Sequence, residues 1–200
     1  MAITSLKSGI STRSGMAGNT LIYPGSYESI ATTTLSSAAS TITFSSIPST
    51  YTHLQVRFIG KSVTTNGTYD ALLMRFNSDT ATNYSQHAIL GNGTSAVVDV
   101  NNGVGYIIVD PIASSGAIAN NFGVGIIDIL DYANTNKFKT IKNTSGFDNN
   151  ATGGTNFQYG YKTESSGNWR SASAISTITF NTGSASNFAQ YTSFALYGIA

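Results

Sequence analysis

The residues of this sequence that could carry acid–base or metal chemistry are few. The chain has two histidines, His53 and His87, and no cysteine. A zinc site needs three or four convergent ligands, and neither histidine has a carboxylate or a second histidine at ligand spacing. We therefore interpret both histidines as strand residues and expect no metal site and no cofactor.

Two carboxylates lie close together in the sequence, at Asp128 and Asp131. A glycosidase needs two carboxyl groups that flank one bond. Side chains alternate between the two faces of a strand, so residues three apart point to opposite faces. The spacing argues against a catalytic pair, and residues 132–136 (YANTN) predict a turn with Asp131 at its start.

Two loops, 77–80 (NSDT) and 148–150 (DNN), superficially resemble calcium loops because they are rich in Asp and Asn. An EF-hand needs alternating oxygen ligands over twelve residues and a closing Glu, which neither loop has. Turns closed by Asp or Asn side chains are the simpler interpretation, with an irregular calcium site as the alternative. The glycines of 123–125 lie in a strand pattern without a following helix, so they are no nucleotide fingerprint. We expect no catalytic residues and no enzyme.

Aromatic residues are the best candidates for ligand binding. Tyr159, Tyr161 and the single tryptophan, Trp169, flank the polar stretch 164–168, which we expect to be a loop. An aromatic face bordered by polar side chains suits a sugar ring or a protein partner. The alternative is that these rings pack inside the fold, because alternating aromatics are ordinary strand content.

The charge of the chain excludes several classes of partner. Ten basic and nine acidic residues give a net charge of +1, and only 10% of residues are charged, against about 25% in typical globular domains. No basic stripe is present to neutralise phosphates, so we expect no nucleic-acid binding. The longest apolar stretches, 106–109 and 126–130, are far shorter than the roughly 20 residues of a membrane helix. The first residues lack the apolar core of a secretory signal, so we expect synthesis in the cytoplasm without membrane insertion.

From residue 27 onward, short alternating apolar patterns are separated by turns, which is typical of an all-β protein. We expect an antiparallel β-sandwich of the jelly-roll type with about ten strands and an extended N-terminal tail. The long loops 61–69, 110–121 and 148–156 are where binding sites of a sandwich would lie. The residues expected in the core share one face of their strands: Val56, Phe58, Met74, Phe76, Ile127, Ile129, Ile178, Phe180, Phe194 and Leu196.

Residues 1–24 differ from the body, 25–200, which we expect to be a single sandwich domain. Their apolar residues are sparse and interrupted by Gly and Ser, so the segment cannot bury enough surface to fold alone. We expect an anchoring tail that becomes ordered along a partner. Its anchor residues would be Ile3, Leu6, Ile10, Met16 and Leu21.

Several stretches resemble a recurring pattern in virion proteins of cyanophages and other aquatic bacteriophages. They are 40–54 (STITFSSIPSTYTHL), 76–84 (FNSDTATNY) and 193–199 (SFALYGI), and the leader elements 5–9 (SLKSG) and 18–19 (GN) are similar to those of the same proteins. The resemblance implies a place on a virion, assembled in the host cytoplasm, and it implies no catalytic residues.

Two functions from different classes remain open. The first is a non-enzymatic structural protein of the virion surface, either a capsid-decorating (cement) protein or a tail-appendage component. It would dock on other virion proteins through its tail and form a homo-oligomer. The alternative is a carbohydrate-binding adhesin, such as a tail-fibre tip that recognises a host surface glycan.

Overall fold

The structure is a computed structural model that describes residues 15–17, 20–22, 27–150 and 160–200. These residues form fourteen strands and no helix, so the expectation of an all-β protein is confirmed. They therefore contain no helix that could span a membrane.

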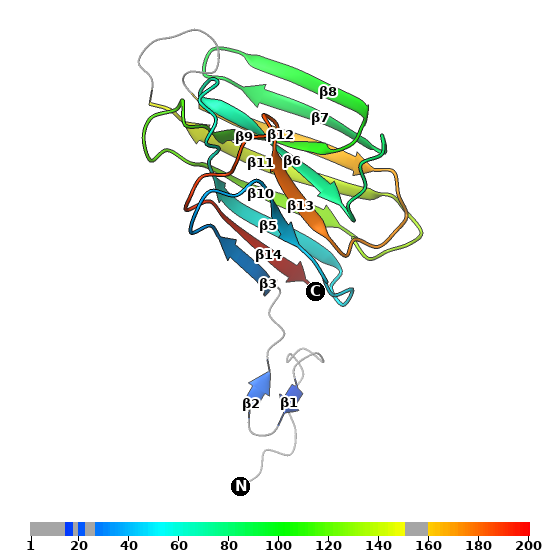
Figure 1. Ribbon diagram of the computed structural model, residues 1–200. Helices are drawn as coiled ribbons and strands as arrows, with labels where there is room; N and C mark the ends of the chain where they lie inside the picture. The colour runs from blue at the N-terminus through cyan, green and yellow to red at the C-terminus, as the bar shows by residue number, and fades with distance from the viewer. Residues whose placement is uncertain (1–14, 18–19, 23–26, 151–159) are drawn as a thin grey trace.

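The larger of the two main sheets has eight strands. They are β3 (Tyr27–Thr34), β5 (His53–Gly60), β7 (Tyr84–Gly91), β8 (Ala96–Val104), β10 (Gly123–Leu130), β11 (Lys139–Asp148), β12 (Gly160–Trp169) and β14 (Ser193–Ile199). Their order across the sheet is β3-β14-β5-β10-β11-β12-β7-β8 (Figure 1). Every neighbouring pair is antiparallel.

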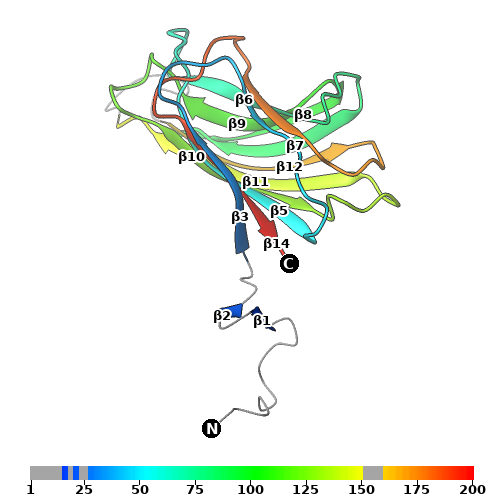
Figure 2. The same cartoon turned by 60° about the horizontal axis from the view of Figure 1, so that its bottom comes forward.

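The smaller sheet has four strands, β4 (Ile42–Phe44), β6 (Tyr69–Phe76), β9 (Ile107–Ala113) and β13 (Ile178–Thr182), in the order β4-β13-β6-β9. All of its pairs are antiparallel, and it lies on one face of the larger sheet (Figure 2). Two further strands, β1 (Gly15–Ala17) and β2 (Thr20–Ile22), pair with each other in a separate two-stranded sheet.

The core lies between the two main sheets, as the alternation along the strands predicts. All ten residues expected in the core are buried, with exposed fractions between 0% and 5%. The rings of Phe180 from the small sheet and Phe194 from the large sheet lie 4.7 Å apart, centroid to centroid. Gly125 makes room for the ring of Phe58, which lies only 2.4 Å from the position that a Cβ atom at residue 125 would have.

Polar side chains close the turns. Asn77, at a left-handed φ of 49°, donates from Nδ2 to Ala174 O (2.8 Å) and accepts from the backbone N–H groups of Ser176 and Thr177. Asn92 likewise accepts from the backbone of Ser95 in the hairpin between β7 and β8. The Asn92 contact closes its own turn, as Asn side chains commonly do, whereas Asn77 holds the turn after β6 against the segment that precedes β13.

The strand pattern differs from the expected one in two places. Residues 164–168 are the middle of β12 and not a loop, and β9 extends through Asp110 to Ala113, into the expected loop 110–121. Both differences lengthen strands without adding one. The total is fourteen strands where about ten were expected, and β1, β2 and β3 are among the additional strands. In β12 the cause is tertiary, because β11 and β7 pair with it on both sides.

Candidate functional site

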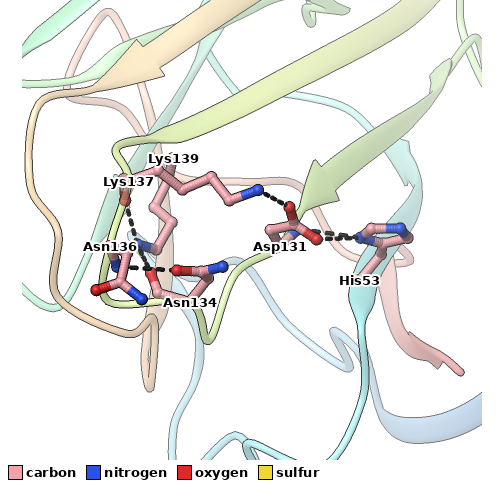
Figure 3. A network of polar contacts seen from close by, with 6 residues as sticks. All are labelled: His53, Asp131, Asn134, Asn136, Lys137 and Lys139. Carbon is pink, nitrogen blue, oxygen red and sulfur yellow. Dashed lines mark hydrogen bonds and ion pairs between the residues drawn. The ribbon is translucent and has the colours of Figure 1, made fainter.

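One cluster of charged side chains lies at the end of the sandwich where β10 stops and β5 begins (Figure 3). Asp131 has a left-handed φ of 50°, which ends β10 and starts the turn expected there. Its carboxylate accepts a hydrogen bond from Lys137 and has Oδ1 3.5 Å from Nδ1 of His53. The hydrogen bond from Lys137 is the main cause that lowers the pKa of Asp131.

His53 and Asp131 are close enough to be considered as a catalytic dyad, but the hydrogen bonding gives histidine a different role. The backbone N–H of Asp131 donates to Nδ1 of His53 across 3.0 Å, so Nδ1 is an acceptor and the proton of the neutral ring is on Nε2. A general-base histidine has the opposite tautomer, with Nδ1–H donating to the carboxylate and Nε2 free to accept a proton. His53 therefore fastens the turn after β10 to the start of β5.

Lys139 makes a second set of hydrogen bonds that links separate segments at the same end of the molecule. Its side chain is fully buried, and Nζ donates to the carbonyl oxygens of Asn134 (2.5 Å), Lys137 (2.9 Å) and Ala172 (3.3 Å). Burial lowers the pKa of Lys139. The three carbonyls use all three donors of the ammonium group, so this lysine links the 131–138 turn to the segment after β12.

The remaining carboxylates of interest are also occupied by internal hydrogen bonds. Asp128 accepts from Gln55 Nε2 (2.8 Å) on the outer face of the large sheet, and it shares no hydrogen-bond partner with Asp131. In the two loops that resemble calcium loops, Asp79 accepts from Ala81 N (2.9 Å) and Asp148 from Asn150 N (2.6 Å). Both are the side-chain-closed turns expected from the sequence. No group of three metal-ligating side chains occurs within the described ranges.

Trp169 does not offer an open aromatic face, so the expectation that it binds a ligand needs correction. It is only 2% exposed, and its ring packs between Phe76 and Tyr84, with centroids 5.6 and 6.2 Å away. Its indole N–H donates to Oδ2 of Asp79 across 2.8 Å. This buried position follows from β12, because odd-numbered residues of that strand all point into the sandwich.

Tyr161 lies on the same inner face and is 5% exposed. It packs edge-on against Tyr69, with 4.8 Å between the ring centroids. Both tyrosines line a cleft of about 310 Å³ between the sheets, together with Val97 and Asp99 of β8. Tyr159, the third aromatic candidate, lies outside the described residues.

The expected tail anchors fall largely outside the described part of the chain. This holds for Ile3, Leu6 and Ile10. Met16 and Leu21 lie in β1 and β2, where they are directly opposite each other.

The most unusual surface is the outer face of the eight-stranded sheet, opposite the core. Thirteen large apolar residues of the described chain are exposed, and eight of them lie on this one face: Tyr27, Ile59, Ile89, Val98, Val100, Val124, Ile126 and Leu130. Sheets that face water normally carry polar side chains on the solvated side.

Strand pairing gathers six of these residues into two groups. In the central group, Ile59 and Val124 lie directly opposite each other on β5 and β10, and Ile126 follows two residues along β10. In the edge group, Ile89 of β7 lies opposite Val98 of β8, with Val100 two residues further along.

Sequence analysis missed this surface, although one signal was present. The run Ala96-Val97-Val98 is apolar at consecutive positions. Consecutive strand residues point to opposite faces, so a strand with this run must either be buried on both faces or expose valine.

Comparison of the chain with protein-family models, with curated proteins and with solved structures gave no match. The functional argument therefore depends on the geometry of these surfaces and on the resemblance seen in the sequence.

Proposed function

We propose that this chain is a non-enzymatic structural protein of a bacteriophage virion surface, either capsid-decorating or part of a tail appendage. The observation that carries the proposal is the outer face of the large sheet, which holds eight of the thirteen exposed large apolar residues. Apolar patches on a soluble chain mark surfaces that bind other macromolecules. Such a face fits a protein whose role is to be packed against neighbouring subunits.

The outer face also has a composition typical of protein interfaces. The guanidinium of Arg57 lies 5.6 Å from the ring centre of Tyr27 and 5.4 Å from that of Tyr197. Tyrosine and arginine are enriched at interfaces, where their large side chains contribute strongly to binding. This aromatic and cationic group lies beside the central apolar group, because Arg57 is directly opposite Ile126 on the neighbouring strand.

We further infer that the sandwich is a jelly roll with two inserted hairpins. The eight strands β3, β4, β5, β6, β9, β10, β13 and β14 pass from one sheet to the other in chain order, except that β6 and β9 both lie in the small sheet. Numbered from one to eight along the chain, they have the order 1-8-3-6 in the large sheet and 2-7-4-5 in the small one. This is the order that two Greek keys produce in a jelly roll, an architecture common in viral capsid proteins and lectins. The hairpins β7–β8 and β11–β12 then widen the large sheet.

The resemblance of 40–54, 76–84 and 193–199 to aquatic phage virion proteins supports a virion over other assemblies. Docking through residues 1–24 is part of the proposal, because a weakly binding segment gains strength when many copies are held close together. The other virion proteins and further copies of this chain would be its partners.

The direct test is to locate the chain in particles purified from cells that produce it. Mass spectrometry of the particles, followed by electron microscopy with a labelled chain, should find it in many copies on the shell or along an appendage. Absence of the chain from purified particles would contradict the proposal.

A second test separates the docking surface from the fold. We expect the double variant Val124→Thr, Ile126→Thr to fold normally but to enter particles less well, because both side chains are exposed. The matched control is Val63→Thr, Ile118→Thr, which changes two exposed apolar residues away from this face. The triple variant Ile3→Ser, Leu6→Ser, Ile10→Ser tests the tail in the same assay. Equal incorporation of all variants would exclude both surfaces.

A carbohydrate-binding adhesin is the second candidate, and the cleft of about 310 Å³ beside Tyr69 and Tyr161 favours it. Aromatic rings next to the carboxylate of Asp99 could hold a sugar ring by stacking and hydrogen bonding. A glycan array with the purified chain tests this candidate. Binding that is lost in Tyr69→Ala and kept in Tyr191→Ala, an exposed tyrosine elsewhere, would favour the adhesin.

A further inference from the structure

The four edge strands of the two main sheets differ in how they are protected. An unprotected edge presents unpaired N–H and C=O groups to other chains. In the small sheet, β4 has only three residues. β9 contains Pro111, and side chains of the large sheet cover its edge: Asn143 Nδ2 donates to Val109 O, and Gln86 Oε1 accepts from Ile108 N.

In the large sheet, β3 and β8 each carry one carboxylate, Glu28 and Asp99, and neither has a lysine, arginine or proline. They differ in their other side chains. β3 ends in three consecutive threonines, 32–34, whereas β8 exposes three valines. Val98 is 80% and Val100 is 55% exposed on the outer face, and Val97 is 40% exposed on the other. Among the described residues, no strand pairs with the outer side of β8.

We propose that β8 pairs antiparallel with β8 of a second copy of this chain, across a two-fold axis at Val100. The pairing would join two eight-stranded sheets into one continuous sheet. A nine-residue strand is roughly 30 Å long, so the contact offers a full row of backbone hydrogen bonds. This proposal concerns the isolated chain and does not depend on the proposed function.

Charge selects the register. Full overlap of two Ala96–Val104 strands places Val100 opposite Val100 of the second copy and Asp99 opposite Asn101. Within one chain, Asn101 Nδ2 already donates to Asp99 Oδ2 at 3.2 Å, so the same amide lies within reach of both carboxylates. A shift of the partner by two residues shortens the overlap in either direction. In one direction it opposes the two Asp99 carboxylates, and like charges directly opposite are destabilising. In the other it places Asp99 opposite Gly103, which has no side chain to donate to it.

The same register makes the edge apolar group continuous across the axis. Val98 of one copy lies diagonal to Val100 of the other, and diagonal neighbours in a sheet are within reach of each other. In each copy, Ile89 of β7 lies directly opposite Val98, on the side of β8 away from the two-fold axis. Pairing would cover the most exposed large apolar side chain of the described residues, Val98, which supports a second copy of the same strand as the occupant.

The first experiment measures self-association of the full-length chain by sedimentation over a concentration series. We expect a reversible dimer, since a single strand pair buries less surface than a standard stable interface. Val100→Lys would put two ammonium groups against each other at the axis and should raise the dimer dissociation constant by about tenfold or more. The control Val63→Lys changes an exposed valine away from the outer face, 38% exposed, and should leave the constant unchanged.

The second experiment tests the register. The chain has no cysteine, so single cysteines are specific probes. Directly opposite residues have Cα atoms about 4.5–5.5 Å apart, which suits a disulfide. Val100→Cys should therefore form a covalent dimer under mild oxidation. Val98→Cys should not form one, because residue 98 lies opposite residue 102 of the second copy, so the two cysteines are four residues apart along the paired strands.

Three results would overturn the proposal. The first is a monomer at all concentrations, and the second is an equal loss of association in Val100→Lys and Val63→Lys. The third is crosslinking of Val98→Cys as efficient as that of Val100→Cys, which would show another register. Far-UV circular dichroism of each variant checks that the sheet is intact, and the exposed positions of all these side chains make unfolding an unexpected result.

Discussion

The indole N–H of Trp169 donates to Oδ2 of Asp79 across 2.8 Å and so connects the end of β12 to the turn after β6. The same oxygen accepts from Asn83 Nδ2 at 2.9 Å, and Oδ1 accepts from Ala81 N. The hydrogen bonds from Asn83 and then Trp169 lower the pKa of Asp79, against the opposing effect of burial. The carboxylate thus fastens a turn to the core.

This relationship predicts energetic coupling between the two side chains. We expect Trp169→Phe and Asp79→Asn each to lower the free energy of unfolding by about 1–3 kcal/mol at pH 7, the usual range for a hydrogen bond to a charged group. The double variant should cost less than the sum of the two, because Trp169→Phe removes the same hydrogen bond that Asp79→Asn weakens by removing its charge. Urea denaturation of the four proteins gives the coupling energy.

The pH dependence checks the same interaction. The folded pKa of Asp79 is lowered, so its stabilisation is present above the unfolded value of about 3.9 and is lost as the pH falls through the folded value. The coupling energy should therefore vanish in acid. Strict additivity of the two changes at pH 7 would contradict the prediction.

The second prediction concerns the stability contributed by the core. Phe180 is fully buried against Phe194, and Phe180→Ala should cost about 3–5 kcal/mol, the usual penalty for removing a buried aromatic ring. Phe138→Ala is the matched control, since Phe138 is 53% exposed, and should change stability by less than about 0.5 kcal/mol. Similar thermal midpoints for the two variants would show that the inner face is misassigned.

The fold class and the core could be predicted because alternation with period two carries that information directly. In β6, Leu72, Met74 and Phe76 alternate with less buried residues, and each is fully buried. Such a pattern fixes the register of the strand once one face of the sheet is buried. A slip of the register by one residue would move all three apolar side chains to the solvent face.

β12 could not be predicted in the same way. Its inner face carries Thr163 and Ser165 beside the aromatic ends, so the sequence 164–168 has the composition of a loop. Both hydroxyl residues are buried because β11, β12 and β7 extend the large sheet over β9. Polar side chains of these strands face the backbone of β9. Ser165 Oγ donates to Asn143 Oδ1, and Asn143 in turn donates to Val109 O. Only the tertiary pairing makes a strand of this segment, and that pairing turns Trp169 inward.

The tautomer of His53 is a third prediction. Because the backbone N–H of Asp131 donates to Nδ1, the neutral ring should carry its proton on Nε2. Nitrogen-15 NMR of the histidine ring distinguishes the two tautomers directly. A proton on Nδ1 at neutral pH would contradict the assignment. It would make a catalytic dyad of His53 and Asp131 possible again, and His53→Gln would then be compared with His87→Gln.

The last prediction concerns alkaline pH and Tyr84. The side chain is fully buried, its hydroxyl accepts from Phe76 N (3.1 Å), and it donates to the carbonyl oxygens of Phe76 or Asp79. Burial, the largest cause, raises the pKa of Tyr84 to about 12. The unfolded value is about 10, so between pH 10 and 12 the unfolded chain has lost this proton while the folded chain keeps it.

Unfolding therefore releases a proton in this window, and stability must fall as the pH rises. Two pKa units correspond to at most about 2.7 kcal/mol. Tyr84→Phe should be less stable than the natural chain at pH 8, because the N–H of Phe76 loses its acceptor. The difference between the two proteins should then narrow above pH 10, as measured by urea denaturation from pH 8 to 11.5. Tyr191→Phe, at an exposed position, controls for the loss of one hydroxyl. A constant difference between Tyr84→Phe and the natural chain across this range would show that Tyr84 ionises equally in both states and is not held in the interior.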